Sequence, residues 1–120
     1  MGTRACIIQQ NTDGSYSSIY NNNDGYIDGL GATLFKYYND TGDVCDLISQ
    51  GDCSYPGSSY GDSNSKAITR NSLAEIIEAA KDVGYDYYYL FANNNGKWRW
   101  YLALNPKSDI KFWSPLEIYF

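Results

Sequence analysis

The sequence contains no histidine, and this absence excludes several kinds of chemistry. Without an imidazole there is no Ser-His-Asp or Cys-His nucleophile, no base that titrates near neutral pH, and no ordinary zinc site. Catalysis would have to rest on carboxylates, lysines, tyrosines or a cysteine. We therefore expect a protein with no enzymatic activity, no cofactor and no bound metal.

Long apolar runs are missing as well. No segment approaches the roughly 20 apolar residues that a membrane-spanning helix needs, and the N-terminus does not have the composition of a signal peptide. The three cysteines, Cys6, Cys45 and Cys53, are odd in number and form no C-x-x-C pair. These features predict a soluble protein with free thiols in a reducing cytoplasm and with no membrane partner.

Basic residues are scarce. The chain has 9 Lys and Arg against 14 Asp and Glu, which gives a net charge of −5. Residues 1–65 hold eight acids and two bases, whereas residues 66–120 hold six acids and seven bases. An acidic domain lacks the basic surface that attracts phosphate backbones, so we expect no nonspecific binding of nucleic acid.

Aromatic residues, in contrast, are plentiful: they make up 17% of the chain, with 13 Tyr and 3 Trp. Such rings either build the core or form a surface that stacks on planar ligands and partners. Trp98, Trp100 and Trp113 allow a stacking platform, but their place on the apolar phase of the strands favours a core role for at least two of them. Arg99 lies on the opposite phase and faces either a ligand or solvent.

Strand signals lie at both ends of the chain. Six segments have a β-type composition: residues 4–10, 15–21, 85–93, 97–104, 110–113 and 116–120. Asp13 and Gly14 mark a turn between the first two segments, and Asn95 and Gly96 mark a stronger one between the next two. We therefore expect two hairpins, followed by one or two edge strands that Pro115 interrupts.

Helical periodicity occupies the middle of the chain, in residues 28–39, 43–50 and 73–83. Asp28 and Asp43 are the expected N-caps of the first two helices. The third begins with a capping box, in which Ser72 is the N-cap and Glu75 the reciprocal partner. Its expected apolar face consists of Leu73, Ile76, Ile77, Ala80 and Val83.

Hairpins on either side of a helical block are typical of an α+β fold. We expect a single domain, residues 1–120, with an antiparallel sheet of about four to five strands built from the N- and C-terminal hairpins. Two to three helices would cover one face of this sheet. Residues 52–66, rich in Gly, Ser and Asp, would form a long loop.

Residues 19–31 cross from the first hairpin into the first helix and combine short polar side chains with Gly25, Gly29 and Gly31. The segment has some likeness to a calcium loop. Counting from Gly25 as its sixth position, however, places Tyr20 first and Gly31 twelfth, where carboxylates are required. Calcium binding is therefore not expected.

Two interpretations of this crossing remain. Its glycines and the start of the helix offer backbone amides to an anion near Arg4, or they form a tight structural turn. On the first interpretation the protein binds a small nucleotide-like ligand. The candidate ligand-binding residues are Thr3, Arg4, Asn23, Asp24, Gly25, Tyr26, Gly29, Gly31, Trp98 and Arg99.

A series of short motifs resembles a family of small proteins encoded by bacteriophages and prophages. The motifs cover most of the chain, in this order: Thr3-Arg4-x-x-Ile7, Asp13-Gly14, Ile19-Tyr20, Asp24-Gly25-Tyr26, Gly31, Leu34, Tyr38, Leu47-Ile48-x-x-Gly51-Asp52, Tyr89-Leu90-Phe91, Gly96-Lys97-Trp98 and Trp113-x-Pro115-Leu116. Where this chain has Asn22 and Asn23, the family has His-Trp. A function shared with the family would therefore not depend on imidazole here.

The resemblance implies a small protein that acts in the cytoplasm of a bacterial host. We expect a non-enzymatic counter-defence protein that sequesters a nucleotide-like immune signal. The alternative is a protein that inhibits a host defence effector, such as a CRISPR nuclease, by direct binding. Homo-oligomerisation is compatible with both.

Overall fold

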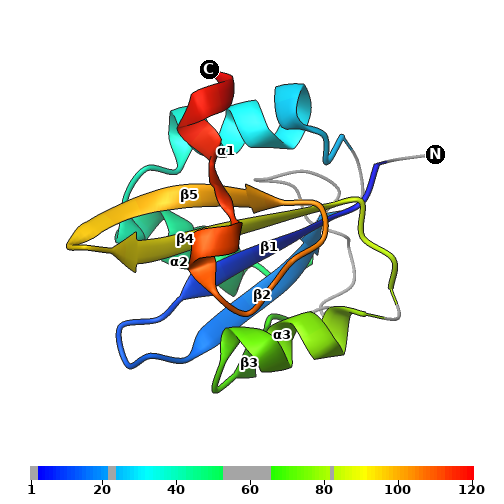
Figure 1. Cartoon of the computed structure of the whole chain (residues 1–120), viewed down its shortest axis with the longest axis vertical. Coiled ribbons are helices and arrows are strands. Elements are labelled where there is room, and N and C mark those ends of the chain that lie inside the picture. The colour runs from blue at the N-terminus through cyan, green and yellow to red at the C-terminus, as the bar shows by residue number, and fades with distance from the viewer. Residues whose placement is uncertain (1–2, 22–23, 53–65, 82) are drawn as a thin grey trace.

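The computed structural model describes residues 3–21, 24–52, 66–81 and 83–120 (Figure 1). Its centre is a sheet of six strands in the order β3-β2-β1-β4-β5-β6. The strands are β1 (Ala5–Gln10), β2 (Tyr16–Asn21), β3 (Ile68–Arg70), β4 (Tyr87–Asn94), β5 (Lys97–Ala103) and β6 (Ser114–Pro115). The predicted α+β class is confirmed, and the sheet is wider than the four to five strands expected.

The helical elements fill the connections between strands. A π-helical turn, η1 (Ile27–Gly31), leads into α1 (Ala32–Tyr37), and α2 (Thr41–Ser49) follows. The third helix, α3 (Leu73–Ala80), precedes β4. Two 3-10 turns, η2 (Ile110–Phe112) and η3 (Leu116–Tyr119), flank β6. No helix of the described residues is long and apolar enough to cross a membrane.

The two central strands run parallel, which corrects the prediction of an antiparallel sheet. Ile7 of β1 lies opposite Tyr89 of β4, whereas every other neighbouring pair of strands is antiparallel. The chain leaves the first hairpin, passes through the helices and returns on the far side of β1. A parallel pair always needs such a crossover, and no local turn motif announces it.

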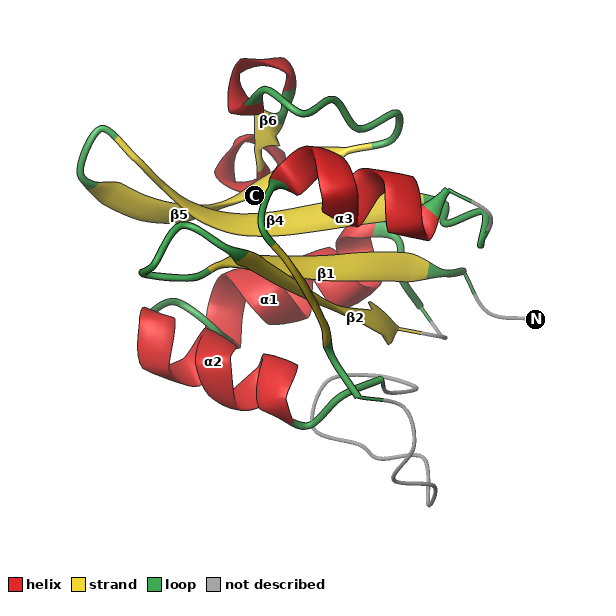
Figure 2. Cartoon of the chain, turned by 90° about the horizontal axis from the view of Figure 1, so that it is seen from below, coloured by secondary structure: helices red, strands yellow, loops and turns green. Residues whose placement is uncertain are grey.

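Helices cover both faces of the sheet, whereas one covered face was expected. Figure 2 shows α3 on one side of the sheet and α1 and α2 on the other. Strand β1 alternates between the two cores accordingly: Ile7 packs with the α1 and α2 side, and Ile8 packs with the α3 side. In β4, residues 88–92 are all buried, as in strands that are covered on both faces.

Several local predictions are confirmed. The N-terminal hairpin pairs Ala5 with Asn21. The Glu75 amide donates to Ser72 Oγ over 3.2 Å, which is the expected cap of α3. In the second hairpin Asn95 and Gly96 have φ values of 58° and 84°, the left-handed conformation that a type I′ turn requires.

Other local predictions are wrong. Asp28 does not cap the first helix, because η1 starts one residue earlier and Tyr26 occupies the cap position without a side-chain hydrogen bond. Helix α2 is capped by Asp40, which accepts from the Asp43 amide over 2.8 Å. Val83 lies beyond the end of α3 and is exposed.

The C-terminal segment differs most from expectation. Residues 110–113 and 116–120 form the turns η2 and η3 instead of strands, and only Ser114 and Pro115 pair with β5. Strand β3 was not predicted; it pairs with only three residues of β2. Most of the predicted loop at 52–66 lies outside the described residues.

Candidate functional site

The backbone of the glycine-containing crossing bonds to itself and to the segment before β1. The Gly25 amide donates to the Thr3 carbonyl over 2.9 Å, and the Leu30 amide donates to the Asp24 carbonyl over 2.7 Å. The Gly29 and Gly31 amides both donate to the Tyr26 carbonyl. These four amides are therefore occupied, and the donors expected to hold an anion are not available.

Gly25 and Gly29 are needed because other backbone groups approach them closely. A Cβ atom on Gly25 would lie 2.8 Å from the Thr3 carbonyl oxygen, and one on Gly29 would lie 2.5 Å from that of Asp24. The buried Tyr89 hydroxyl donates to the Gly25 carbonyl over 2.7 Å and joins the crossing to β4. Of the two interpretations of the crossing, this geometry supports the structural one.

Arg4 anchors the loop that precedes β4. Its guanidinium donates to the Val83 carbonyl over 3.3 Å, and its backbone amide donates to a carboxylate oxygen of Asp86 over 3.1 Å. Asp24 is exposed and has a φ of 55°. Asn23, another of the predicted ligand-binding residues, lies outside the described residues.

Trp98 and Arg99 lie far from the crossing. Ala5, next to Arg4, pairs with Tyr87 at one end of β4, whereas Trp98 pairs with Asn93 near the other end. The six positions between Tyr87 and Asn93 correspond to about 20 Å of strand. The ten candidate residues therefore do not converge on one site.

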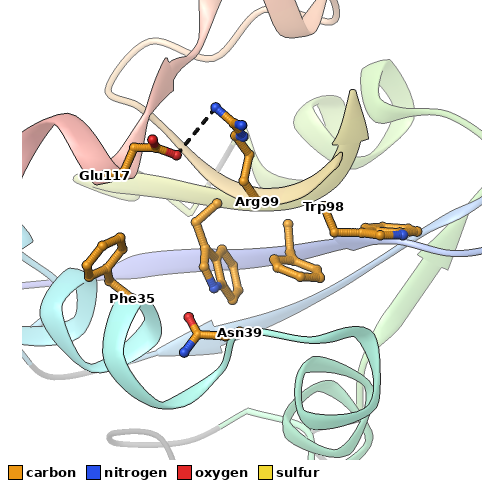
Figure 3. A pocket seen from close by; sticks show the side chains of 7 residues that line it. Phe35, Asn39, Trp98, Arg99 and Glu117 are labelled. Atoms are coloured by element: carbon orange, nitrogen blue, oxygen red, sulfur yellow. Dashed lines mark ion pairs between the residues drawn. The ribbon is translucent and has the colours of Figure 1, made fainter. Parts of the chain in front are cut away.

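Trp98 and Arg99 instead line a small cavity, shown in Figure 3. Its volume is about 100 Å³, and its other lining residues are Phe35, Asn39, Phe91, Trp100 and Glu117. Arg99 forms an ion pair with Glu117 at 3.4 Å. Ligand pockets usually have volumes of about 300 Å³ or more, so this cavity is too small to enclose a nucleotide.

The three tryptophans do not form a common stacking platform. Trp100 packs in the core beneath α1 and α2, where its indole donates to the Tyr38 carbonyl over 2.7 Å. Trp113 packs in the core beneath α3. Trp98 is half-buried and stacks on Phe91, with 5.5 Å between ring centroids. Trp100 and Trp113 are core residues, which confirms the prediction that at least two of the three tryptophans pack in the core.

An apolar surface that the sequence patterns did not predict lies at the C-terminal end of the chain. Five large apolar side chains are exposed there: Leu104 (58%), Phe112 (65%), Ile118 (64%), Tyr119 (45%) and Phe120 (50%). Three of them, Leu104, Phe112 and Tyr119, line one hollow of about 260 Å³ together with Ile27. We call Leu104, Phe112 and Tyr119 the C-terminal surface.

The scaffold below this surface is well anchored. Leu116, at the start of η3, is completely buried, and Phe120 stacks on Phe35 of α1 with 5.0 Å between ring centroids. Figure 1 accordingly shows the C-terminal segment beside α1. The predicted strand over residues 116–120 did not indicate this arrangement. In a strand, alternate side chains would point toward the core, and about half of them would be buried.

Charged groups next to the C-terminal surface are paired within the chain. Arg99 contacts Glu117, and Lys111 contacts Asp109 at 3.6 Å. The Lys111 ammonium also lies 5.3 Å from the centre of the Phe112 ring. The surface therefore combines exposed apolar side chains with a polar border, as protein interfaces do.

Cys6 is buried beneath α3 near Tyr85 and Tyr88. Burial raises the pKa of its thiol to about 12, while a hydrogen bond with Ser18 acts in the opposite direction. Because the thiolate is the reactive form, Cys6 is protected both by its protonation state and by its inaccessibility.

We therefore expect iodoacetamide at neutral pH to alkylate the exposed Cys45 in the folded protein and to alkylate Cys6 only after unfolding. Peptide mass mapping before and after addition of denaturant would follow each site separately. Alkylation of Cys6 in the folded protein at the rate of Cys45 would contradict the buried position of β1.

Within the described ranges no group of three or more Cys, Asp or Glu side chains could hold a metal ion. Comparisons with known protein families, with curated proteins and with solved structures find no match. The structure therefore defines only the structural class of the protein. It is a small α+β protein with an exposed apolar surface at its C-terminal end.

Proposed function

We propose that this chain is a non-enzymatic binding protein that attaches to a protein partner through the C-terminal surface. The observation that carries the proposal is the exposure of Leu104, Phe112 and Tyr119 around one hollow. Contiguous apolar surface of this kind on a folded domain typically marks an interaction site. Aromatic side chains at such sites supply much of the binding energy.

The hollow favours a particular kind of partner. A volume of about 260 Å³ accommodates one or two apolar side chains from another protein. The carboxylates of Glu117 and Asp109 are each paired with a base, so these two acids leave no unpaired negative charge beside the surface. The proposed partner therefore presents an apolar anchor inside a polar border.

The resemblance to proteins of phages and prophages gives the biological direction of the proposal. The partner would be a host defence effector, such as a CRISPR nuclease, and binding would inhibit it. Sequestration of a nucleotide-like signal stays a prediction, and the occupied amides of the crossing do not support it there. Titration calorimetry against adenine-based cyclic and ADP-ribose signals tests it, and absence of heat with all of them would rule it out.

The protein-partner proposal is tested by Phe112→Ser, which removes the most exposed ring of the C-terminal surface. Bacteria that carry a defined defence system and express the chain should lose protection against phage. Phe112→Ser should restore that protection and should weaken binding to the purified effector by at least about tenfold. Plaque counts and biolayer interferometry measure the two effects.

Ile68→Ser is the matched control. Ile68 is also an exposed apolar residue (42%), but it lies on β3 at the opposite edge of the sheet from β6. Equal loss of binding in both variants would contradict the assignment to the C-terminal surface. Sedimentation of the purified chain covers the remaining outcome: a dimer that Phe112→Ser dissociates would show that a second copy occupies the surface.

A further inference from the structure

Another depression adjoins the segment that follows β5. It is a groove of about 410 Å³ between α3 and this segment, lined by Ile77, Glu78, Lys81, Tyr88, Asn105, Pro106 and Lys107. Its volume lies within the range of small-molecule sites. The groove differs from the hollow at the C-terminal surface in having two lysines in its lining.

The groove has a firm wall. The buried Trp113 indole donates to the Lys107 carbonyl over 2.8 Å, and this hydrogen bond holds the segment 105–107 in place. The opposite wall is α3, whose buried Ile76 packs in the core against the sheet. Both walls therefore rest on the core, and the groove exists without a ligand.

Tyr88 of β4 provides an unused polar group in this groove. Its side chain is only 6% exposed, and no residue of the described ranges hydrogen-bonds its hydroxyl. Every fully buried side-chain polar atom in the described ranges has a partner, so this unpartnered hydroxyl must retain contact with solvent. Burial raises the pKa of Tyr88, which keeps the hydroxyl protonated and able to donate.

Two cations accompany this donor. Lys81 follows α3, and Lys107 lies on the opposite wall. Lys81 approaches Glu78 at 3.9 Å, but both side chains are more than 70% exposed, so this pair is weak and is easily rearranged. The half-buried Ile77 and Pro106 supply apolar surface between the polar groups.

We propose that this groove binds a small organic anion that consists of a planar ring and a phosphate or carboxylate group. Lys81 and Lys107 would hold the anion, Tyr88 would donate a hydrogen bond to it, and the ring would lie against Ile77 and Pro106. Charge-assisted hydrogen bonds from two ammonium groups and a neutral phenol favour the anionic over the neutral form of such a molecule. The inference is independent of the protein partner proposed above.

Two probes represent the two possible sources of this chemistry: AMP for nucleotides and benzoate for aromatic acids. Titration of the full chain, followed by ¹H-¹⁵N NMR, should shift the amide resonances of Tyr88 and Lys107 with at least one of them. Adenosine, which has the ring without the anion, should bind at least about tenfold more weakly than AMP. Benzoate alone causing shifts would identify the aromatic-acid source.

Substitutions distinguish binding in this groove from a nonspecific effect of removing a positive charge. Lys107→Gln should weaken binding of the effective probe by about tenfold, and Tyr88→Phe by several-fold. Lys97→Gln, which removes an exposed lysine in the β4–β5 hairpin, should leave the affinity unchanged. Phe112→Ser should also leave the affinity for the anion unchanged. The anion proposal and the protein-partner proposal can therefore fail independently of each other.

The inference is overturned if neither anion shifts the groove resonances at millimolar concentration. It is also overturned if adenosine binds as well as AMP, or if Lys107→Gln and Lys97→Gln reduce the affinity equally. Circular dichroism of each variant confirms that the fold is retained before binding is compared.

Discussion

Gly25→Ala should lower the free energy of unfolding by about 3 kcal/mol, the upper range for an atom forced into a packed site. The new methyl group would lie 2.8 Å from the Thr3 carbonyl oxygen and 2.9 Å from the Ala5 Cβ. Neither of these two groups can move freely. The Thr3 carbonyl accepts a hydrogen bond from the Gly25 amide, and Ala5 is part of β1. Urea denaturation followed by tryptophan fluorescence measures the change.

Gly42→Ala is the control for this substitution. Gly42 lies in the first turn of α2, where the nearest neighbour of an added Cβ is the Asp40 carboxylate at 3.4 Å. Replacement of a helical glycine by alanine stabilises by up to about 1 kcal/mol. Equal and small effects at both positions would mean that the crossing tolerates a side chain, and its interpretation as a ligand loop would then regain support.

Leu116→Ala should cost about 3 kcal/mol, within the range for a fully buried leucine. Leu116 is 0% exposed and packs in the core beneath α1 and α2, although only four residues follow it in the sequence. The substitution leaves a cavity and removes the anchor of η3. Chemical denaturation monitored by circular dichroism gives the free energy.

Ile118→Ala is the corresponding control two residues further on. Ile118 is 64% exposed, so its truncation should change stability by less than about 0.5 kcal/mol. This contrast separates the residue that holds the C-terminal segment from those that it displays. A loss at position 118 equal to that at 116 would contradict the orientation of η3.

Features that depend on a few neighbouring residues could be predicted from the sequence. The turn at Asn95 and Gly96 requires left-handed backbone, and the cap formed by Ser72 and Glu75 satisfies amides one turn away. In both cases the interacting groups lie within four residues of one another. Such local signals do not depend on the tertiary structure of the rest of the chain.

Features set by distant residues could not be predicted in the same way. The parallel pairing of β1 with β4 depends on a crossover through the helices, and β3 is a three-residue strand with every side chain exposed. One long-range signal was present: the unbroken apolar run at 88–92 is typical of a strand buried on both faces. The glycines of the crossing predicted either a tight turn or a ligand site, and the hydrogen bond from the Gly25 amide to the Thr3 carbonyl, which supports the turn, depends on residues far apart in the sequence.

The candidate sites also depend on contacts between residues that are distant in the sequence. Thr3, Arg4 and the glycines of the crossing do lie together, while Trp98 and Arg99 lie near the other end of the sheet. Lys81 and Lys107 could not be predicted to share a site, because they are separated in sequence and only the packing of α3 brings them to one groove. Composition left open whether the aromatic residues build the core or a binding surface, and the structure places Trp100 and Trp113 in the core and exposes Phe112 and Tyr119.

The parallel pairing of β1 with β4 also has a consequence for synthesis. Ala5 leaves the ribosome long before its partner Tyr87, and until then the N-terminal hairpin has no neighbour on its inner edge. An isolated two-stranded hairpin is marginally stable in water. Because the central pair closes such a long loop, we expect folding to be slow for a chain of this size and to be completed only after most of the polypeptide has been made.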